Sequence, residues 1–141
     1  MPSNKSKQVM NKMKRELTAE NKPRVVEPYQ YWARVKRVVD GDTIELDVDV
    51  GFKVTFRERF RLLGVDTPEV YGVKRTSAEY KRGKAASDFV KKKIPVGSWV
   101  EVKVYSDKRE KYGRWLCEIF VDGKSLNETL VKQGFAQEYM I

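Results

Sequence analysis

Short stretches of alternating apolar and polar residues run through most of the chain, and this period of two is typical of half-buried β-strands. The clearest example is residues 44–50, where aliphatic side chains at even positions alternate with carboxylates at odd positions. Similar apolar stretches cover residues 31–39, 54–62, 100–105 and 115–121. Glu58 interrupts the apolar set of residues 54–62, so we expect a bulge or short loop near it. The pattern therefore predicts five short strands.

Two further stretches have apolar residues at helical spacing. One helix is expected from Ser77 or Arg82 to Lys93, ended by Pro95 and Gly97, with an apolar stripe formed by Ala85, Ala86, Phe89 and Val90. A second helix should begin at Ser125-Leu126-Asn127-Glu128, which fits a capping box, and end at Gly134. The order of the predicted elements is three strands, a helix, two strands and a helix. This order predicts a mainly β, α+β fold: a five-stranded Greek-key barrel of the OB type with two or three helices.

The N-terminal segment, residues 1–30, differs from the rest of the chain. It has seven Lys and Arg residues against three Glu residues, which gives a net charge of 7 − 3 = +4. Its apolar residues at positions 9–17 follow a helical spacing, but a helix this short is not stable alone. We expect a basic, flexible tail that acts as a solvated arm, followed by one folded domain over residues 31–141.

Composition narrows the classes of partner and of chemistry. The net charge of +9 favours a polyanionic partner, first a nucleic acid and second an anionic membrane surface, against the alternative of a generally basic protein. The chain has no histidine and one cysteine, Cys117. These counts exclude His-containing catalytic triads, the usual zinc sites and an internal disulfide. Any catalysis must use carboxylates, hydroxyls, cations or a bound metal.

The first residues are polar and basic, with no apolar core of a signal peptide, and no stretch reaches the length of a membrane span. We therefore expect a soluble, cytoplasmic, monomeric protein with no membrane association and no implied protein partner. A secreted protein whose export signal has been removed is the alternative.

Three loops hold the residues that could carry chemistry: residues 40–43, 61–69 and 107–114. Each alone is typical of an ordinary polar turn. Together they supply carboxylates that suit Ca²⁺ or Mg²⁺ at Asp42 and Asp66, and a further carboxylate at Glu69 that could accept a proton from water. They also supply Arg61 and Arg114, which could bind a phosphodiester and stabilise developing charge. The spacing alone does not show that these residues converge.

The same three loops resemble the motifs of the staphylococcal (thermo)nuclease family. The matching stretches are Asp-Gly-Asp-Thr at 40–43, Arg-Leu-Leu-Gly-Val-Asp-Thr-Pro-Glu at 61–69 and Lys-Tyr-Gly-Arg at 111–114, and residues 127–136 look like the helix that follows in that family. The resemblance covers about residues 33–139. It implies an OB-fold barrel that hydrolyses phosphodiester bonds of DNA and RNA with one Ca²⁺ ion, leaving 3′-phosphate ends.

The resemblance also implies a role for each matching position. The implied catalytic residues are the base Glu69 and the phosphate-binding Arg61 and Arg114. The implied metal ligands are the side chains of Asp42 and Asp66 and the backbone carbonyl of Thr67. The implied substrate-binding residues are Lys111, Tyr112 and Tyr139. Two features depart from the family pattern: a shortened C-terminus, and a longer and more charged connection between the second and third strands.

A non-catalytic OB-fold module that binds single-stranded nucleic acid is the alternative function, because such barrels use basic grooves and stacked aromatic residues. The aromatic residues that could serve it are Tyr71, Tyr80, Tyr112 and Trp115. The presence of Arg61, Glu69 and Arg114 with both aspartates favours the enzyme, since function is argued from the site. A structural or protein-interaction domain would leave the charge and the acidic residues unexplained.

Overall fold

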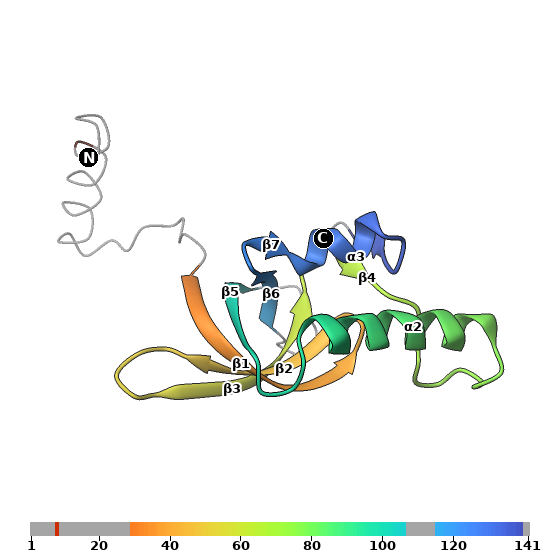
Figure 1. The fold of residues 1–141 in the computed structure, drawn as a ribbon, viewed down its shortest axis with the longest axis horizontal. Helices are drawn as coiled ribbons and strands as arrows, with labels where there is room; N and C mark the ends of the chain where they lie inside the picture. The colour runs from red at the N-terminus through yellow and green to blue at the C-terminus, as the bar shows by residue number, and fades with distance from the viewer. Residues whose placement is uncertain (1–7, 9–28, 107–114, 140–141) are drawn as a thin grey trace.

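The computed structural model describes residues 29–106 and 115–139, together with Gln8. Its elements in chain order are β1 (Tyr29–Asp40), β2 (Thr43–Asp49), β3 (Thr55–Leu62), β4 (Val65–Asp66), α2 (Ala78–Lys93), β5 (Trp99–Ser106), β6 (Trp115–Val121), β7 (Lys124–Ser125), α3 (Leu126–Lys132) and β8 (Gln137–Glu138) (Figure 1). The predicted tail, residues 1–30, lies almost entirely outside the described residues.

Five of the described strands close into a barrel. Neighbouring strands follow the order β3-β2-β1-β5-β6 with antiparallel pairing, and a parallel pairing of β3 with β6 joins the two ends. β1 pairs with β2 over residues 32–40 and with β5 over residues 29–34. Its register with β2 shifts between Val35 and Arg37 and again between Val38 and Asp40. Such irregularities bend a strand and increase its twist. The predicted five-stranded, mainly β barrel of the OB type is confirmed.

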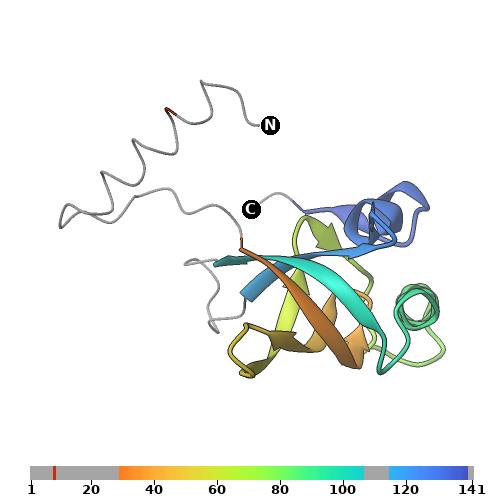
Figure 2. The same cartoon turned by 60° about the vertical axis from the view of Figure 1, so that its left-hand side comes forward.

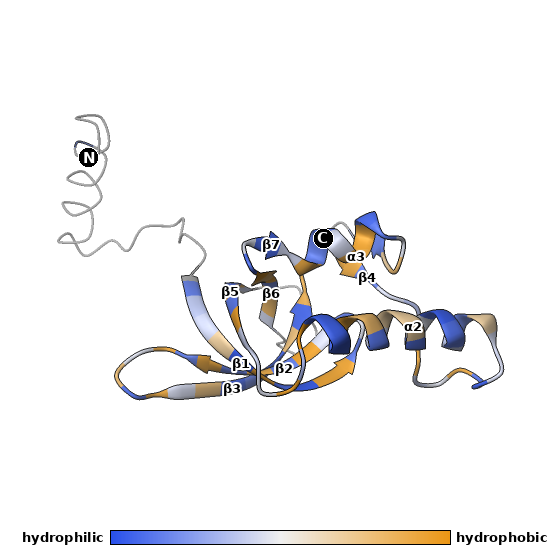
Figure 3. Cartoon of the chain, viewed as in Figure 1, coloured by the Kyte–Doolittle hydropathy of each residue, from blue (hydrophilic) through white to orange (hydrophobic). Residues whose placement is uncertain are grey.

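The predicted bulge at Glu58 is wrong. Glu58 pairs with Leu46 in an unbroken register between β2 and β3, and the irregular positions lie in β1 instead. Glu58 interrupts the apolar pattern because β3 pairs with β6 only over residues 60–62, so residues 55–59 have no described partner strand besides β2 and all five are exposed. This part of the β2–β3 hairpin projects beyond the barrel, as Figures 1 and 3 show. Val54 and Phe56 are accordingly 53% and 43% exposed, whereas Phe60 is 1% exposed.

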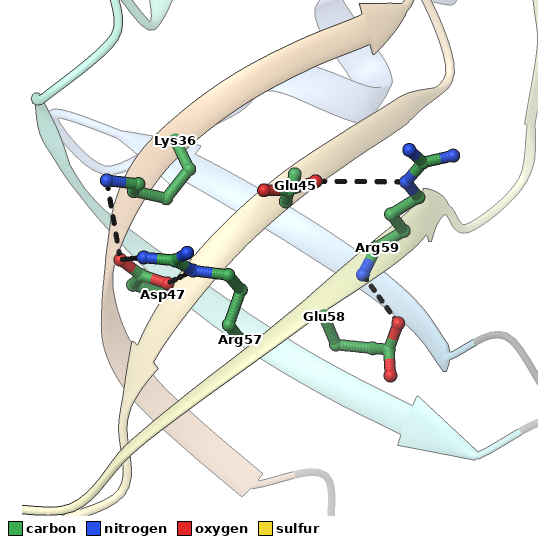
Figure 4. Close-up of polar contacts among 6 residues, drawn as sticks. All are labelled: Lys36, Glu45, Asp47, Arg57, Glu58 and Arg59. Atoms are coloured by element: carbon green, nitrogen blue, oxygen red, sulfur yellow. Dashed lines mark hydrogen bonds and ion pairs between the residues drawn. The ribbon is translucent and has the colours of Figure 1, made fainter.

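Charged side chains line the outer face of the β1–β2–β3 sheet and fix its register (Figure 4). The Nε of Arg57 donates to Oδ1 of Asp47 at 2.7 Å, and the Nε of Arg59 lies 3.8 Å from Oε2 of Glu45. Both are directly opposed cross-strand pairs, which favour this pairing. Arg57 and Arg59 are therefore engaged on the outer face, whereas Arg61, two residues further along β3, reaches the end of the strand.

Both helices lie on the same side of the barrel (Figures 1 and 2). α2 begins after the N-cap Ser77, whose Oγ accepts a hydrogen bond from the backbone N–H of Tyr80 at 3.1 Å, and it packs Ala86 and Val90 into the interior. Ala85 is exposed, so this member of the predicted stripe is wrong, because it lies on the solvent side of the helix. Neither helix of the described ranges is long and apolar enough to cross a membrane.

α3 has the predicted caps. Ser125 Oγ accepts from the backbone N–H of Glu128 at 3.3 Å, and Gly134 follows the C-cap with φ +80°. The N–H groups of Gly134 and Phe135 donate to the carbonyls of Val131 and Leu130, which is the Schellman pattern. This sharp end turns the chain back so that β8 can pair with β4.

Candidate active site

Asp42 links two of the three predicted loops. It lies in the turn between β1 and β2, its side chain is buried, and its Oδ2 accepts a hydrogen bond from the backbone N–H of Thr67 at 3.2 Å. Its backbone carbonyl accepts from the N–H of Leu62 at 2.8 Å, and its Oδ1 accepts from the hydroxyl of Thr43 at 3.2 Å. The Asp-Gly-Asp turn is therefore held against the end of β3 and the segment after β4.

Gly41 makes this close approach sterically allowed. A Cβ atom at this position would lie 2.9 Å from Cγ2 of Thr67 and 3.0 Å from Cβ of Ala86. Any larger residue would push the turn away from Thr67 and from α2. The glycine of the Asp-Gly-Asp turn thus serves tertiary packing as well as the turn itself.

Asp40 and Asp42 have opposite pKa shifts. Burial, followed by the hydrogen bond and the negative charge of Asp42, raises the pKa of Asp40 to about 7. Burial also opposes ionisation of Asp42, but the hydrogen bond from Asp40, the Thr67 N–H and the charge of Arg61 together lower the pKa of Asp42. Two carboxylates this close favour a single shared proton, and Asp42 is the one that stays ionised.

Arg61 at the end of β3 contacts the next acidic residue. Its Nη2 lies 3.6 Å from Oδ1 of Asp66, and its Cζ lies 4.9 Å from the ring centroid of Tyr139. Tyr139 is held there because its backbone N–H donates to the carbonyl of Gly64 at 3.0 Å. The β4–β8 pairing, in which Asp66 opposes Gln137, brings the C-terminal segment to this position. The guanidinium is thus placed by a carboxylate on one side and an aromatic ring on the other.

A cleft of about 350 Å³ opens beside these residues. Residues 66–69 form one wall, the first turns of α2 contribute Glu79 and Arg82, and residues 134–137 form the remaining wall. Glu69 is exposed in this cleft and has no ion pair among the described residues. A carboxylate with this surrounding is free to bind a water molecule.

Gly83 allows α2 to pack closely against the segment that carries Glu69. A Cβ at Gly83 would lie 2.6 Å from the carbonyl oxygen of Pro68 and 2.9 Å from that of Glu69. α2 therefore touches the backbone that carries Glu69. The sequence signal for this contact is a glycine inside an otherwise helical stretch, which often marks a packing requirement.

The donor set suits a hard divalent cation. The hydrogen bond between Thr67 and Asp42 brings Asp42 next to the Asp66-Thr67 segment. The side chains of Asp42 and Asp66 and the carbonyl of Thr67 offer oxygen atoms, which Ca²⁺ and Mg²⁺ prefer as ligands. Over the described ranges, no cluster of three or more His, Cys, Asp or Glu side chains is arranged to hold a metal ion. An ion bound here would therefore complete its coordination with backbone carbonyls and water, as these cations commonly do.

The structure brings six predicted residues to one end of the barrel: Asp42, Arg61, Asp66, Thr67, Glu69 and Tyr139. Lys111, Tyr112 and Arg114 lie outside the described residues. The described chain resumes at Trp115, and the register of β6 with β3 places Leu116 opposite Arg61. Glu79 and Arg82 were missed, because only the packing of α2 places them in the cleft.

Comparisons with known proteins find sequence matches over more than half of the chain. Residues 59–141, more than half of the chain, match the family model described as staphylococcal nuclease homologue. The chain is 41% identical over 103 residues to a protein named Thermonuclease from Staphylococcus intermedius, covering 73% of this chain and 56% of that protein. It is 39% identical over 106 residues to Thermonuclease from Staphylococcus hyicus, covering 74% of this chain and 57% of that protein.

A third relative is Endonuclease YhcR from Bacillus subtilis (strain 168), with 37% identity over 116 residues, covering 79% of this chain and 9% of that protein. The chain thus spans little more than half of the two thermonucleases and a small part of the third relative. The family match and the three ordered motifs establish that this chain belongs to the family of staphylococcal nuclease homologues.

Proposed function

We propose that the protein is a calcium-dependent nuclease that hydrolyses phosphodiester bonds of DNA and/or RNA. The observation that carries this proposal is the convergence of Asp42, Arg61, Asp66 and Glu69 beside one cleft. It combines a metal-binding donor set, a phosphate-binding cation and an unpaired carboxylate. The names of the relatives, two thermonucleases and an endonuclease, agree with this chemistry.

Glu69 is the proposed general base. Its carboxylate is exposed in the cleft, where it takes a proton from the attacking water as that water forms a bond to phosphorus. The bond from phosphorus to the 5′ oxygen breaks, that oxygen takes up a proton from solvent to become the 5′-hydroxyl of one product, and the phosphate stays on the 3′ oxygen of the other product. A positioned general base contributes roughly 10²–10⁴-fold to such a step.

Arg61 and Arg114 are the proposed phosphate-binding residues. Arg61 is held between Asp66 and the ring of Tyr139, so its planar guanidinium is already oriented before substrate binds. Two N–H groups of one guanidinium can bind two phosphate oxygens and stabilise the charge that develops on them. Arg114 takes its role from the matching motif, as do Lys111 and Tyr112 for contacts with the nucleotide phosphate.

Asp42, Asp66 and the carbonyl of Thr67 are the proposed Ca²⁺ ligands. A divalent cation at this position supplies positive charge that neutralises the phosphate of the substrate. The low pKa of Asp42 keeps this ligand ionised near neutral pH. The hydrogen bond from Thr67 keeps its orientation fixed.

The test is to incubate the purified chain with end-labelled single-stranded DNA or RNA, with Ca²⁺ or with a chelator, and to identify the product ends. We expect cleavage with Ca²⁺, none with chelator, and 3′-phosphate ends. Absence of cleavage under every metal condition would refute the enzyme. If the protein binds the labelled strand and does not cleave it, the binding module is established instead.

The base is tested with Glu69→Gln, which keeps the shape of the side chain and removes its basicity. We expect kcat to fall roughly 10²–10⁴-fold with unchanged thermal stability, because Glu69 is exposed and has no described ion-pair partner. Glu79→Gln is the matched control, since Glu79 lines the same cleft from α2. If Glu79→Gln causes the large loss and Glu69→Gln does not, the assignment of the base is wrong.

A further inference from the structure

Arg82 has an unusual position in the cleft. Three carboxylates, those of Asp66, Glu69 and Glu79, line it together with this arginine from the second turn of α2. Arg82 is the only cation among the described residues that line the cleft. A nucleic-acid phosphate that enters would be repelled by the carboxylates of Glu69 and Glu79, whereas the charge of Asp66 is offset by Arg61, 3.6 Å away. Arg82 is therefore the lining residue that can attract such a phosphate.

The guanidinium of Arg82 is available for a ligand. The side chain is exposed, and over the described ranges no carboxylate lies within ion-pair distance of it. The adjacent Gly83 packs closely against the carbonyls of Pro68 and Glu69, so α2 is fitted tightly to this segment. Arg82 therefore lines the same cleft as the proposed base, and no ion pair between the two is present in the described structure.

Asp66 connects this cleft to the contacts of Arg61. Asp66 lines the cleft and also lies 3.6 Å from Nη2 of Arg61, whose Cζ lies 4.9 Å from the ring centroid of Tyr139. Glu69 and Arg82 line the same cleft, whereas Arg61 and Tyr139 do not. Arg61 and Arg82 are therefore two separate cationic positions, connected through the segment 66–69.

We propose that Arg82 forms a second phosphate subsite, which binds the phosphate next to the scissile one within the cleft that Glu69 also lines. This inference rests on the proposed nuclease function. It assigns the cleft to a strand that continues on both sides of the bond that is cut. The protein should then prefer internal bonds of a longer strand to a substrate that has a single phosphate.

The experiment compares Arg82→Gln with Lys81→Gln on two substrates in Ca²⁺. Lys81 is the neighbouring exposed cation and does not line the cleft, so it controls for a general loss of charge. The substrates are a 12-nucleotide single strand and a dinucleoside monophosphate, whose only phosphate is the scissile one. For Arg82→Gln we expect kcat/KM on the 12-nucleotide strand, divided by kcat/KM on the dinucleoside monophosphate, to fall about tenfold. The fall should come from a higher KM on the long strand. Lys81→Gln should leave that ratio unchanged.

Binding of the 12-nucleotide strand in chelator gives an independent measurement. Loss of one phosphate contact should reduce the slope of log K against log salt concentration by about 0.7 for Arg82→Gln and not for Lys81→Gln. Equal effects of both variants, or an unchanged ratio and slope for Arg82→Gln, would overturn the subsite. A parent protein that binds but never cleaves refutes the proposed nuclease instead, and the salt slope then still decides the role of Arg82.

Discussion

The side-chain amide of Asn127 in α3 donates a hydrogen bond to the backbone carbonyl of Leu63 at 2.9 Å, across 64 positions of the chain. The same Nδ2 donates to the carbonyl of Cys117 at 3.0 Å, and Oδ1 accepts from the N–H of Ile119 at 3.1 Å. One buried side chain therefore joins α3, β6 and the turn between β3 and β4. That turn connects Arg61 to Asp66, so the site depends on this network.

Replacement of Asn127 by alanine should destabilise the fold. The N–H of Ile119 and the carbonyl of Leu63 would lose this partner, and an unsatisfied buried polar group costs about 1–3 kcal/mol. We expect the free energy of unfolding in urea to fall by about 2–4 kcal/mol for the two groups together. Lys132→Ala, at an exposed position of the same helix, should change it by less than about 0.5 kcal/mol. Equal stability of the two variants would contradict the structural role of Asn127.

Gly83→Ala should reduce activity even though alanine favours helices. The added Cβ would overlap the carbonyls of Pro68 and Glu69, and overpacking of this kind costs about 1–3 kcal/mol. The contact is relieved only if α2 moves away from the segment that carries the base, and a misplacement of about 1 Å can cost about 10²-fold in rate. We therefore expect kcat to fall at least about tenfold.

The opposite exchange, Ala85→Gly, is the control for Gly83→Ala. Ala85 is exposed on the same helix, so its replacement should cost about 1 kcal/mol through helix propensity and leave kcat unchanged. Thermal unfolding and initial rates measured on both variants separate the two effects. Full activity of Gly83→Ala would show that α2 does not fix the position of Glu69.

Cys117 should be chemically inert in the folded protein. Its thiol is fully buried, and burial, with a smaller contribution from the charge of Glu118, raises its pKa far above the ordinary value. The thiolate is the reactive species, so a disulfide reagent at pH 8 should modify the folded protein only as fast as it unfolds. The rate should rise steeply through the urea transition. Rapid modification without denaturant would mean that β6 is not packed as described.

Most of the barrel could be predicted because its strands have one covered face. In residues 44–50 and 100–105 the period of two reports directly which side chains face the core. The two-residue strands β4 and β8 are too short to show any period, so their pairing was not foreseen. The apolar pattern of residues 54–62 predicts one buried face, but Val54 and Phe56 are exposed although Leu46 and Val48 of β2 are buried, because sequence alternation does not reveal where the barrel ends.

The site was only partly predictable for a related reason. Asp42, Arg61, Asp66 and Glu69 were singled out by residue type and by motif, but their convergence depends on barrel closure and on hydrogen bonds such as that between Thr67 and Asp42. Arg82 comes to the cleft on a helix that is distant in sequence from β1 and β2. No local pattern distinguishes it from the other cations of α2, since only the packing of this helix against residues 68–70 brings Arg82 to the wall of the cleft.

Phe52→Asn should stabilise the protein. Phe52 lies at the tip of the β2–β3 hairpin with φ 55° and is 99% exposed, so its ring buries almost nothing in the described structure. A left-handed backbone costs a bulky L-residue roughly 1–2 kcal/mol, and asparagine tolerates it better. We expect the free energy of unfolding in urea to rise by about 0.5–1 kcal/mol. Val54→Asn is the control, because Val54 is also exposed on the hairpin but does not have a positive φ, and it should bring no gain. A loss of stability for Phe52→Asn would mean that the ring is packed against another part of the protein in solution.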